Sequence, residues 1–294
     1  MPTLSLRRDP ALRPRMGAQL DRAHELNAGL AFCHLNNDPN NFGGYDYSGN
    51  GITVTGYGSG HVALTPGHRN LLVDCDGTAS YVALSAAPLD WRTTSITAIF
   101  YIQSHANTGN DAYMWSYLGP GSAGFTFGRT SANTAWVLIH DGTNQLQLQS
   151  FSVDGVPFGA SSTTFGAWSQ VAFVWDLAAK SARTYLNGVN QLSGSNSSLV
   201  PGNLPPPSTY LYGPSITGGA PIVKGANAGI ESTFIFRDAK PDGFLAEHYL
   251  NPYGGFQDTP TRRWWALSSG IFFRRGLSPR LGSRGSGRGY GATL

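Results

Sequence analysis

The chain has 294 residues and a formal net charge of +3; only 13% of its residues are charged, whereas 38 are glycine and 12% are aromatic. This length can bury a large core, and the composition favours short strands joined by glycine turns over a coiled coil or disorder. No apolar run approaches the roughly 18 residues of a membrane span. The opening MPTLSLRRDPALRPRMG has no apolar segment, so we expect neither a membrane helix nor a secretory signal.

The small net charge hides an uneven distribution. Residues 1–22 carry five arginines and two aspartates, and residues 262–294 carry seven arginines and no acidic residue. The remaining residues, 23–261, hold eight basic and 15 acidic side chains, a balance of −7. An acidic body with two basic arms bears on which partners the protein binds, and not on how it folds.

The first third of the chain begins with an arginine- and proline-rich stretch that shows no sustained hydrophobic period, so we interpret residues 1–23 as an extended basic arm. The first predicted strand is Leu30–Leu35, which is apolar on both faces. Asn36–Gly60 is rich in asparagine, glycine and tyrosine and is predicted to be loop. Strands are predicted again at Leu71–Cys75 and Tyr81–Leu84.

Strand patterns continue through the middle of the chain. Ser95–Gln103 alternates between two sets of side chains, as a β-strand does. Short aromatic strands are predicted at Tyr113–Leu118 and Phe125–Phe127. Ala135–His140 and Gln145–Val153 flank an Asp-Gly turn and therefore predict a hairpin.

The segment Trp168–Leu192 has the strongest pattern in the chain. Its first strand is apolar on both sides, as in the middle of a packed sheet, and a short polar crossing leads to a second strand. Asn187-Gly188 then predicts a type I′ turn, because both of its central positions need positive φ. We expect three consecutive antiparallel strands here, followed by a loop over Asn190–Pro207.

The last predicted elements are a strand at Gly229–Arg237 and a short helix at Pro241–Leu250, which Asn251-Pro252 ends. About a dozen short strands at regular turn spacing predict an all-β, two-sheet antiparallel sandwich.

Four motifs of the sequence resemble a known family. W-x-x-V-A…D…Y-L-N-G around Trp168 is similar to the laminin-G/pentraxin/concanavalin A-like jelly roll. H-E-L-N-A-G-L at His24, D-Y-S-G-N-G at Asp46 and D-G-T-A-S-Y-V at Asp76 resemble the laminin-G-like proteins of bacteriophages, in the same order. The resemblance implies a jelly-roll domain over residues 24–255, between a basic N-terminal arm (1–23) and an arginine-, glycine- and aromatic-rich C-terminal arm (256–294).

The jelly roll of this family also occurs in glycosidases, which would require catalytic carboxylates in the chain. Such enzymes need two carboxylates at a defined separation, and on this fold they lie on one strand as E-x-D-x-(x)-E. The chain has only three glutamates, Glu25, Glu231 and Glu247, and none has an acidic partner at that spacing. It also lacks G-x-S-x-G, H-E-x-x-H and phosphate-loop motifs. We therefore expect no catalytic residue, and we interpret His61 and His68 as surface residues.

Ligand sites are less clearly marked. The family resemblance implies a candidate calcium site built from loop aspartates, although turn aspartates more often serve their own backbone. A sugar could stack on aromatic side chains of one strand, although core packing is the favoured interpretation of these residues. Cys33 and Cys75 indicate free buried thiols or a single bridge. The candidates are Asp38, Asp46, Asp74, Asp76 and Asp111 for calcium, and Tyr113, Trp115 and Tyr117 for a glycan.

The two arms carry the partner predictions. Arginine beside tryptophan and phenylalanine is typical of protein–protein contact residues, and the final SRGSGRGYG cannot build a core. Nucleic-acid or membrane binding are weaker alternatives, because the body is acidic and the arm has no helical period. The predicted contact residues are Arg7, Arg8, Arg13, Arg15, Arg262, Arg263, Trp264, Trp265, Phe272, Phe273, Arg274 and Arg275.

These observations predict a non-enzymatic bacteriophage virion protein, located in the virion and needing no cofactor. Its role would be capsid decoration (cement) or head appendage, and its arms would bind the major capsid protein, other virion proteins or neighbouring copies in a homo-oligomer. The alternatives are a carbohydrate-binding module for attachment to host surface glycans and a tail component.

Overall fold

The computed structural model describes residues 18–35, 46–57, 62–66, 71–76, 81–104, 112–118, 123–129, 135–149, 168–216 and 227–257. All of them belong to one compact unit, Met1–Gln257. None of the helices in these described segments has the length and hydropathy needed to cross a bilayer.

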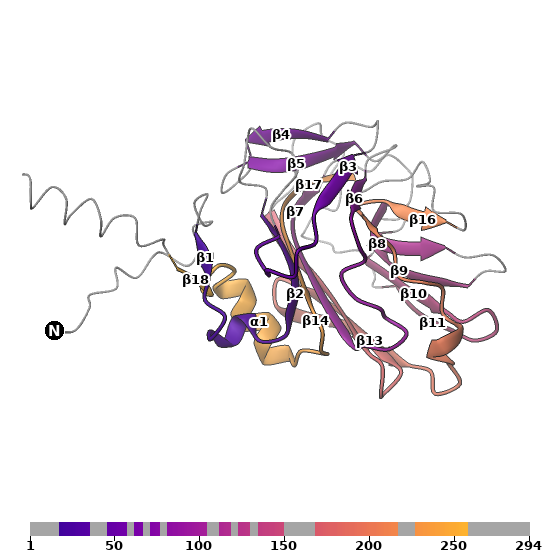
Figure 1. Cartoon of the computed structure of the whole chain (residues 1–294). Coiled ribbons are helices and arrows are strands. Elements are labelled where there is room, and N and C mark those ends of the chain that lie inside the picture. Colours follow the sequence, from indigo (N-terminus) through magenta and orange to yellow (C-terminus); the bar gives the residue numbers. More distant parts are fainter. Residues whose placement is uncertain are drawn as a thin grey trace, which may run out of the picture. The chain divides into compact units, whose positions relative to one another are not determined.

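The described strands form two large sheets that face each other (Figure 1). The first sheet has the order β14 (Val189–Ser195), β13 (Ser181–Leu186), β12 (Trp168–Asp176), β7 (Ile96–Ser104), β17 (Asn227–Phe236), β5 (Leu71–Asp76) and β4 (Val62–Pro66), and β2 (Leu30–Leu35) also pairs with β17. The second has the order β11 (Gln145–Gln149), β10 (Ala135–His140), β9 (Gly124–Arg129), β8 (Ala112–Leu118), β15 (Tyr210–Leu211), β6 (Val82–Leu84) and β3 (Val54–Tyr57).

Pairing within both sheets is antiparallel except for β16 (Pro214–Ile216), which runs parallel to β8. The predicted fold class, an all-β two-sheet antiparallel jelly-roll sandwich, is confirmed. The core between the sheets is strongly aromatic: Phe127 of β9 stacks on Phe173 of β12 with ring centroids 4.7 Å apart. Such contacts fix one sheet on the other, because buried aromatic rings contribute large apolar areas and prefer definite geometries.

The hairpin predicted from Asn187-Gly188 is present. The two residues have φ values of 50° and 79°, as a type I′ turn requires, and β12, β13 and β14 are consecutive antiparallel neighbours. The loop predicted over Asn190–Pro207 begins later than expected, at residue 196, because Val189–Ser195 forms β14 and pairs with β13. β14 lies at the sheet edge, where polar side chains point to solvent and the sequence loses its apolar signal.

The sequence also missed several short strands. β3 falls within the stretch that was predicted to be loop, and β4, β15 and β16 had no predicted counterpart. Each contains glycine, proline or only two residues, so its local preference for extended structure is weak and its pairing depends on the neighbouring strand.

A third layer covers the outer face of the first sheet. Helix α1 (Asp242–Leu250) begins after Pro241, which takes the N-cap position rather than the first turn, and ends at Asn251. With the short helix η1 (Glu25–Asn27) it encloses a second buried cluster that includes Tyr101, Phe234 and Leu245. We call this region the cap layer.

The two cysteines lie in different clusters. Cys75 is part of the core between the sheets, and Cys33 belongs to the cap-layer cluster. Both are buried thiols outside any disulfide, which confirms the thiol interpretation and excludes the alternative of a bridge between them. Burial, with a smaller effect from the charge of Asp46, raises the pKa of Cys33, so the thiol stays protonated.

His248 anchors α1 on the sheet. Its Nδ1 lies 2.7 Å from the Tyr101 hydroxyl, which donates to the His248 carbonyl oxygen, and Gln170 Nε2 donates to the same hydroxyl over 3.0 Å. Burial lowers the pKa of His248 to about 3, with a smaller contribution from the charge of Lys240. The folded protein therefore keeps this imidazole neutral in mildly acidic solution.

We expect acid to destabilise the protein through His248. The imidazole takes up a proton near pH 6.5 in the unfolded chain but only near pH 3 in the folded chain. Stability is therefore highest above pH 6.5 and is lost as the pH falls toward 3, because the proton favours the unfolded chain. The free energy of unfolding should fall by about 2 kcal/mol between pH 7 and pH 5 from this residue. Urea denaturation of His248→Gln at both pH values should lack this loss, whereas His140→Gln, in the other sheet, should retain it. An unchanged pH dependence in His248→Gln would contradict the assignment.

Candidate functional site

The predicted sugar-stacking residues do not form a common surface. Trp115 is fully buried in the core between the sheets, and its Nε1 donates to the Ser208 carbonyl over 3.2 Å. Tyr117 is half-buried and packs against the same core. The side chain of Tyr113 lies outside the described residues. Stacking on Trp115 is therefore wrong, and core packing, the favoured interpretation of this residue, is confirmed.

Asp46, one of the calcium candidates, is occupied by its own loop. Its Oδ1 accepts from the backbone N–H groups of Cys33 (3.1 Å) and Ser48 (2.9 Å), and its Oδ2 accepts from the Ser48 hydroxyl (2.8 Å). Ser48 and Asn50 in turn donate to the Ala31 carbonyl over 3.0 and 2.7 Å. The D-Y-S-G-N-G motif thus binds its loop to the backbone of β2, and this structural role accounts for the motif.

The remaining calcium candidates give no site in the described part of the chain, where no group of three or more potential metal ligands comes together. Asp38 and Asp111 lie outside the described residues. Asp74 and Asp76 are placed in β5 by their backbone, and their side chains are not described.

The three glutamates lie in different settings. The register of β17 against β7 shifts between Ile230 and Ser232, which places Glu231 in a β-bulge. Glu231 is fully buried and accepts a 2.6 Å hydrogen bond from Trp168 Nε1. Glu25 and Glu247 are exposed on the two helices of the cap layer. The bond to Trp168 gives Glu231 a structural role that joins β17 to β12.

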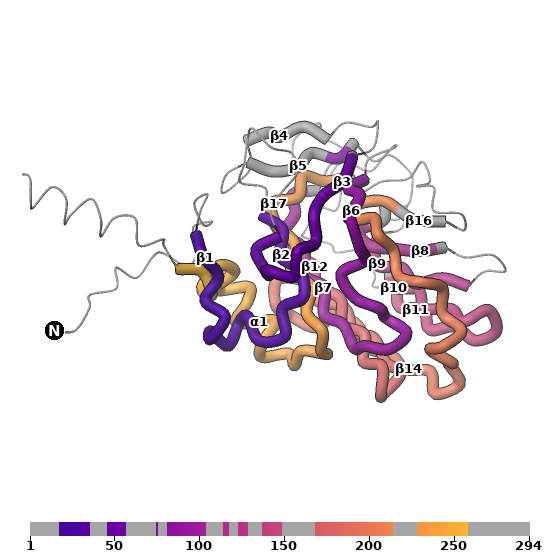
Figure 2. Tube along the Cα trace, viewed as in Figure 1, coloured from indigo at the N-terminus to yellow at the C-terminus, as the bar shows by residue number. Residues whose placement is uncertain are grey.

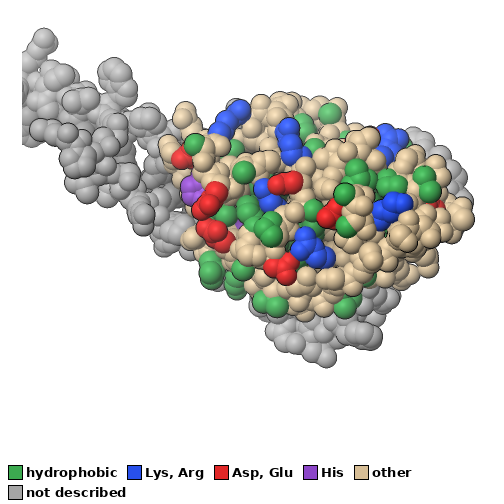
Figure 3. All heavy atoms as spheres, turned by 90° about the horizontal axis from the view of Figure 1, so that it is seen from below, with side chains coloured by type: hydrophobic (Ala, Val, Ile, Leu, Met, Phe, Trp, Pro, Cys, Tyr) green, Lys and Arg blue, Asp and Glu red, His purple; other side chains and the backbone are tan. Residues whose placement is uncertain are grey.

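One end of the sandwich is built from loops, which lie along its lower edge in Figure 1. They connect β6 to β7 (residues 85–95), β10 to β11 (141–144), β12 to β13 (177–180) and β14 to β15 (196–209). We call this region the loop end. Seen from below, it shows acidic and basic side chains interspersed with hydrophobic ones (Figure 3).

Hydrogen bonds between separate loops hold the loop end together. Asp141 accepts from the N–H groups of Thr143 (2.8 Å), Asn144 (2.6 Å) and Val200 (2.8 Å). Burial alone would raise the pKa of Asp141, but these bonds together lower it to about 2. Lys180 Nζ adds a 2.7 Å bond to the Ser197 carbonyl. The loops are therefore preorganised, as binding loops on a rigid scaffold are.

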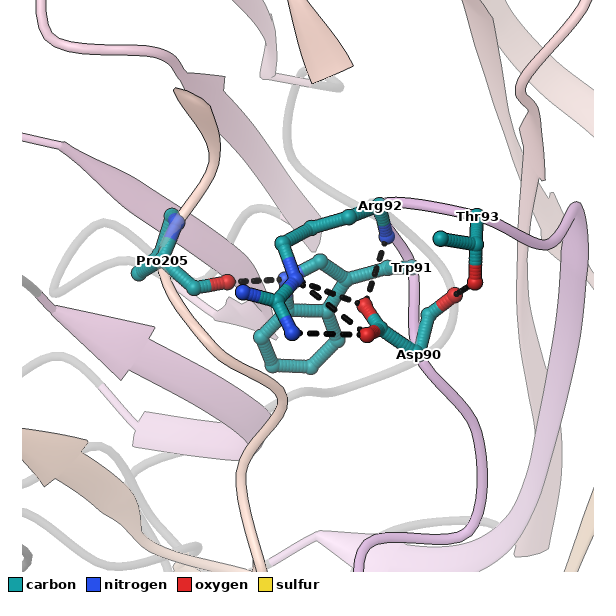
Figure 4. A network of polar contacts seen from close by, with 5 residues as sticks. All are labelled: Asp90, Trp91, Arg92, Thr93 and Pro205. Atoms are coloured by element: carbon teal, nitrogen blue, oxygen red, sulfur yellow. Dashed lines mark hydrogen bonds and ion pairs between the residues drawn. The ribbon is translucent and has the colours of Figure 1, made fainter. Parts of the chain in front are cut away.

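The most exposed charged pair of the loop end is Asp90 with Arg92 (Figure 4). Arg92 Nη2 lies 2.7 Å from Asp90 Oδ2, and the side chains of Arg92 and Asp90 are 35% and 31% exposed. Trp91 lies between them in sequence but points into the core, where its ring stacks on Phe125 at 4.2 Å. Trp91 Nε1 donates to the Pro205 carbonyl over 2.8 Å, which joins the 85–95 loop to the 196–209 loop.

A second feature lies where the described chain begins and ends. β1 (Gln19–Leu20) pairs with β18 (Phe256–Gln257), and Asp21 N–H donates to the Gly255 carbonyl over 2.8 Å. We call this two-stranded sheet the clasp; Figure 2 shows its strands side by side. The clasp lies just outside the 24–255 range that the sequence predicts for the domain, so residues of both predicted arms join the folded body.

The clasp is well anchored in the cap layer. Ala18 and Phe256 are buried in the cap-layer cluster, and Asn27 Nδ2 donates to both the Asp21 and the Gly255 carbonyls, over 2.7 and 2.8 Å. The predicted contact residues of the arms, Arg7 to Arg15 and Arg262 to Arg275, lie outside the described residues. The clasp nevertheless brings together the beginning and the end of the described chain, because β1 follows Ala18, its buried anchor, and β18 ends at Gln257.

Comparison with protein families matches residues 76–226 to the concanavalin A-like lectin/glucanases superfamily. Two similar solved structures are the binding domain of Paraclostridial mosquitocidal protein 1 (TM-score 0.55) and the binding domain of botulinum neurotoxin DC, in complex with rat synaptotagmin II (TM-score 0.54). Each is 13% identical and covers 76% of this chain, while this chain covers 52% of each. A structure of botulinum neurotoxin type C, whose cell entry is described as dependent upon interaction with two ganglioside molecules, is similar with a TM-score of 0.51, 13% identity and coverages of 76% and 51%.

The chain thus spans about half the length of these structures, and at such low identity the likeness concerns the fold. A comparison with curated proteins gave no match. The family match takes in half of the chain, including the Trp168 strand and the Asn187-Gly188 hairpin, and the two-sheet sandwich agrees with it. The chain belongs to the concanavalin A-like lectin/glucanase superfamily.

Proposed function

We propose that this protein is a non-catalytic, lectin-type binding module that recognises a glycan through its loop end. The observation that carries the proposal is the preorganisation of that surface: loops from four connections are tied to one another by side-chain hydrogen bonds while charged groups remain exposed. Little conformational entropy would be lost when such a surface binds a ligand.

The setting of the glutamates supports a binding role rather than hydrolysis. Glycoside hydrolysis uses two carboxyl groups on either side of the scissile bond. Glu231 is fully buried and bonded to Trp168, and Glu25 and Glu247 lie in the cap layer, away from the strands that carry such pairs in this fold. The related toxin folds are described as binding domains, which is consistent with this use of the sandwich.

The proposal is tested by applying the full-length protein to a glycan array and measuring affinity for the best ligands by titration calorimetry. We expect saturable binding to a defined group of glycans. Absence of binding to every glycan on the array would contradict the proposal.

A second candidate function is display on a virus particle, as a capsid decoration, head-appendage or tail protein held by its arms. The clasp favours it, because β1 and β18 hold the roots of both arms side by side. Residues 1–17 contribute four arginines and one aspartate, and residues 258–294 contribute seven arginines and one aspartate. Two basic segments joined to neighbouring strands could bind one partner together, which would raise avidity without any new contact.

We expect attachment to particles to need both arms. Deleting residues 1–17 or residues 258–294 should each weaken co-sedimentation with particles assembled without the protein by at least about 100-fold, because one of two linked anchors is lost. The control is Gln19→Cys/Gln257→Cys, whose disulfide should lock the clasp and leave attachment intact. Equal attachment of the deleted and complete chains, with the body folded in both, would contradict this function.

A further inference from the structure

We propose that Asp90 and Arg92 form a subsite for a neutral sugar, which they recognise through two adjacent hydroxyl groups. This inference rests on the glycan-binding function proposed above and names the residues and the class of sugar. It is carried by the rigidity of the pair, its exposure and its internal charge balance.

The two side chains are fixed relative to each other. Arg92 donates from Nε to both carboxylate oxygens of Asp90 (2.9 and 3.2 Å) and from Nη2 to Oδ2 (2.7 Å). The Arg92 backbone N–H donates to Oδ1 over 3.0 Å, which closes an Asx turn. The Asp90 carbonyl accepts from the N–H groups of Thr93 (3.1 Å) and Thr94 (3.0 Å). A ligand would therefore find the pair already in place.

The backbone beneath the pair is equally constrained. The Trp91 indole is fully buried, stacks on Phe125 and donates to the Pro205 carbonyl (Figure 4). From the other direction, Trp175 Nε1 of β12 donates to the Trp91 carbonyl over 3.0 Å. The exposed pair thus stands on a part of the chain that cannot shift without disturbing the core.

The pair still has hydrogen-bonding capacity to offer. About a third of each side chain is exposed, and Arg92 Nη1 makes no hydrogen bond to any of the described residues. A carboxylate can accept about four hydrogen bonds. Asp90 accepts from three N–H groups of Arg92, the backbone N–H, Nη2 and an Nε–H shared between both oxygens, so one acceptor direction remains. A donor and an acceptor therefore lie next to each other at the surface, beside the exposed Thr93.

This arrangement fits two adjacent sugar hydroxyls. One hydroxyl can donate to Asp90 while its neighbour accepts from Arg92, and hydrogen bonds to ionised groups are stronger than those between neutral groups. The hydrogen bond from Arg92 lowers the pKa of Asp90, so the carboxylate remains an acceptor in mildly acidic solution. Because the guanidinium charge is already balanced by Asp90, the pair favours a neutral diol over an anionic sugar.

The chain offers a matched control in a second Arg–Asp pair. Arg183 Nη1 lies 2.6 Å from Asp242 Oδ1, and the two side chains are 24% and 62% exposed. This pair serves α1: Arg183 Nη2 donates to the Lys240 carbonyl over 2.8 Å, and the Tyr185 hydroxyl donates to Asp242 over 2.6 Å. It has the same chemistry as the Asp90–Arg92 pair but lies at the start of the helix.

The experiment compares four full-length variants with the unaltered protein. Asp90→Asn and Arg92→Gln remove the proposed subsite, and Asp242→Asn and Arg183→Gln remove the control pair. The probes are neutral and sialylated oligosaccharides on one array, followed by titration calorimetry with the strongest neutral ligand. We expect each subsite variant to lose at least about tenfold in affinity, and each control variant to stay within about twofold. Thermal unfolding checks that all four variants remain folded.

The outcomes separate this inference from the function on which it rests. If the unaltered protein binds no glycan, the proposed function itself fails. If it binds glycans and folded Asp90→Asn and Arg92→Gln bind them equally well, or if it binds only sialylated glycans, the subsite is overturned while the lectin function stands. A loss confined to the two subsite variants, with a neutral ligand, supports it.

Discussion

Replacing Gly188 by alanine is expected to lower the free energy of unfolding by about 3 kcal/mol. Gly188 has a φ of 79°, in the left-handed region that costs a residue with a β-carbon about 1 kcal/mol or more. A β-carbon there would also lie 2.8 Å from the Ala246 Cα and 3.3 Å from the Leu245 carbonyl oxygen of α1. These are backbone atoms, so the helix would have to move away from the hairpin.

Gly142→Ala is the matched control for this prediction. Gly142 also has a positive φ, of 95°, but a β-carbon there would meet no other group within 4 Å. It should therefore show the backbone cost alone, about 1 kcal/mol. Urea denaturation followed by tryptophan fluorescence measures both variants. Equal losses in the two would show that the approach of Gly188 to α1 contributes nothing to stability.

The same contact predicts where the Gly188 variant should loosen. The turn packs on α1, whereas the core between the sheets lies on the other face of β12 and β13. Hydrogen exchange in Gly188→Ala should therefore rise first in Asp242–Leu250 and only later in Trp168–Asp176, because local opening follows the elements with fewest buried contacts.

The hairpin also shows what sequence patterns can and cannot predict. Asn187-Gly188 predicted the turn because its requirement for positive φ is local. The packing of Gly188 against Ala246 joins residues far apart in the chain, and no local pattern contains it. The strand Leu30–Leu35 was predicted with correct bounds because it is apolar on both faces, whereas the extent of β14 was underestimated because its outward side chains are polar.

Prediction of the candidate site was harder, for a physical reason. Alternation in the sequence shows which side chains of a strand share a face, but not which face is buried. The sequence therefore allowed Trp115 either a place in the core or a contact with sugar, and only the packing of the two sheets decides for the core. Asp90 and Arg92 were not singled out at all. The local sequence D-W-R-T-T predicts an Asx turn. The exposure of Asp90 and Arg92, however, depends on the burial of Trp91, which packs on Phe125 and donates to the Pro205 carbonyl.

Trp91 should give the largest single effect on stability. Trp91→Ala is expected to cost about 4 kcal/mol, since it empties a fully buried site and leaves the Pro205 carbonyl without its donor. Trp91→Phe keeps an aromatic ring against Phe125 but still loses that hydrogen bond, so about 2 kcal/mol is expected. Urea denaturation measures both, and a loss below about 1 kcal/mol in Trp91→Ala would contradict this role.

The Trp91 variants also link the core to the proposed binding surface. Trp91→Phe frees the 85–95 loop from Pro205 but leaves Asp90 and Arg92 unchanged, so glycan affinity should fall while the pair itself is intact. In Arg92→Gln affinity should also fall, but with almost no loss of stability, because a partly exposed ion pair contributes little. If Trp91→Phe is destabilised yet binds glycan with unaltered affinity, the anchoring of the loop by the core is irrelevant to recognition, and preorganisation no longer explains why this end of the sandwich would bind.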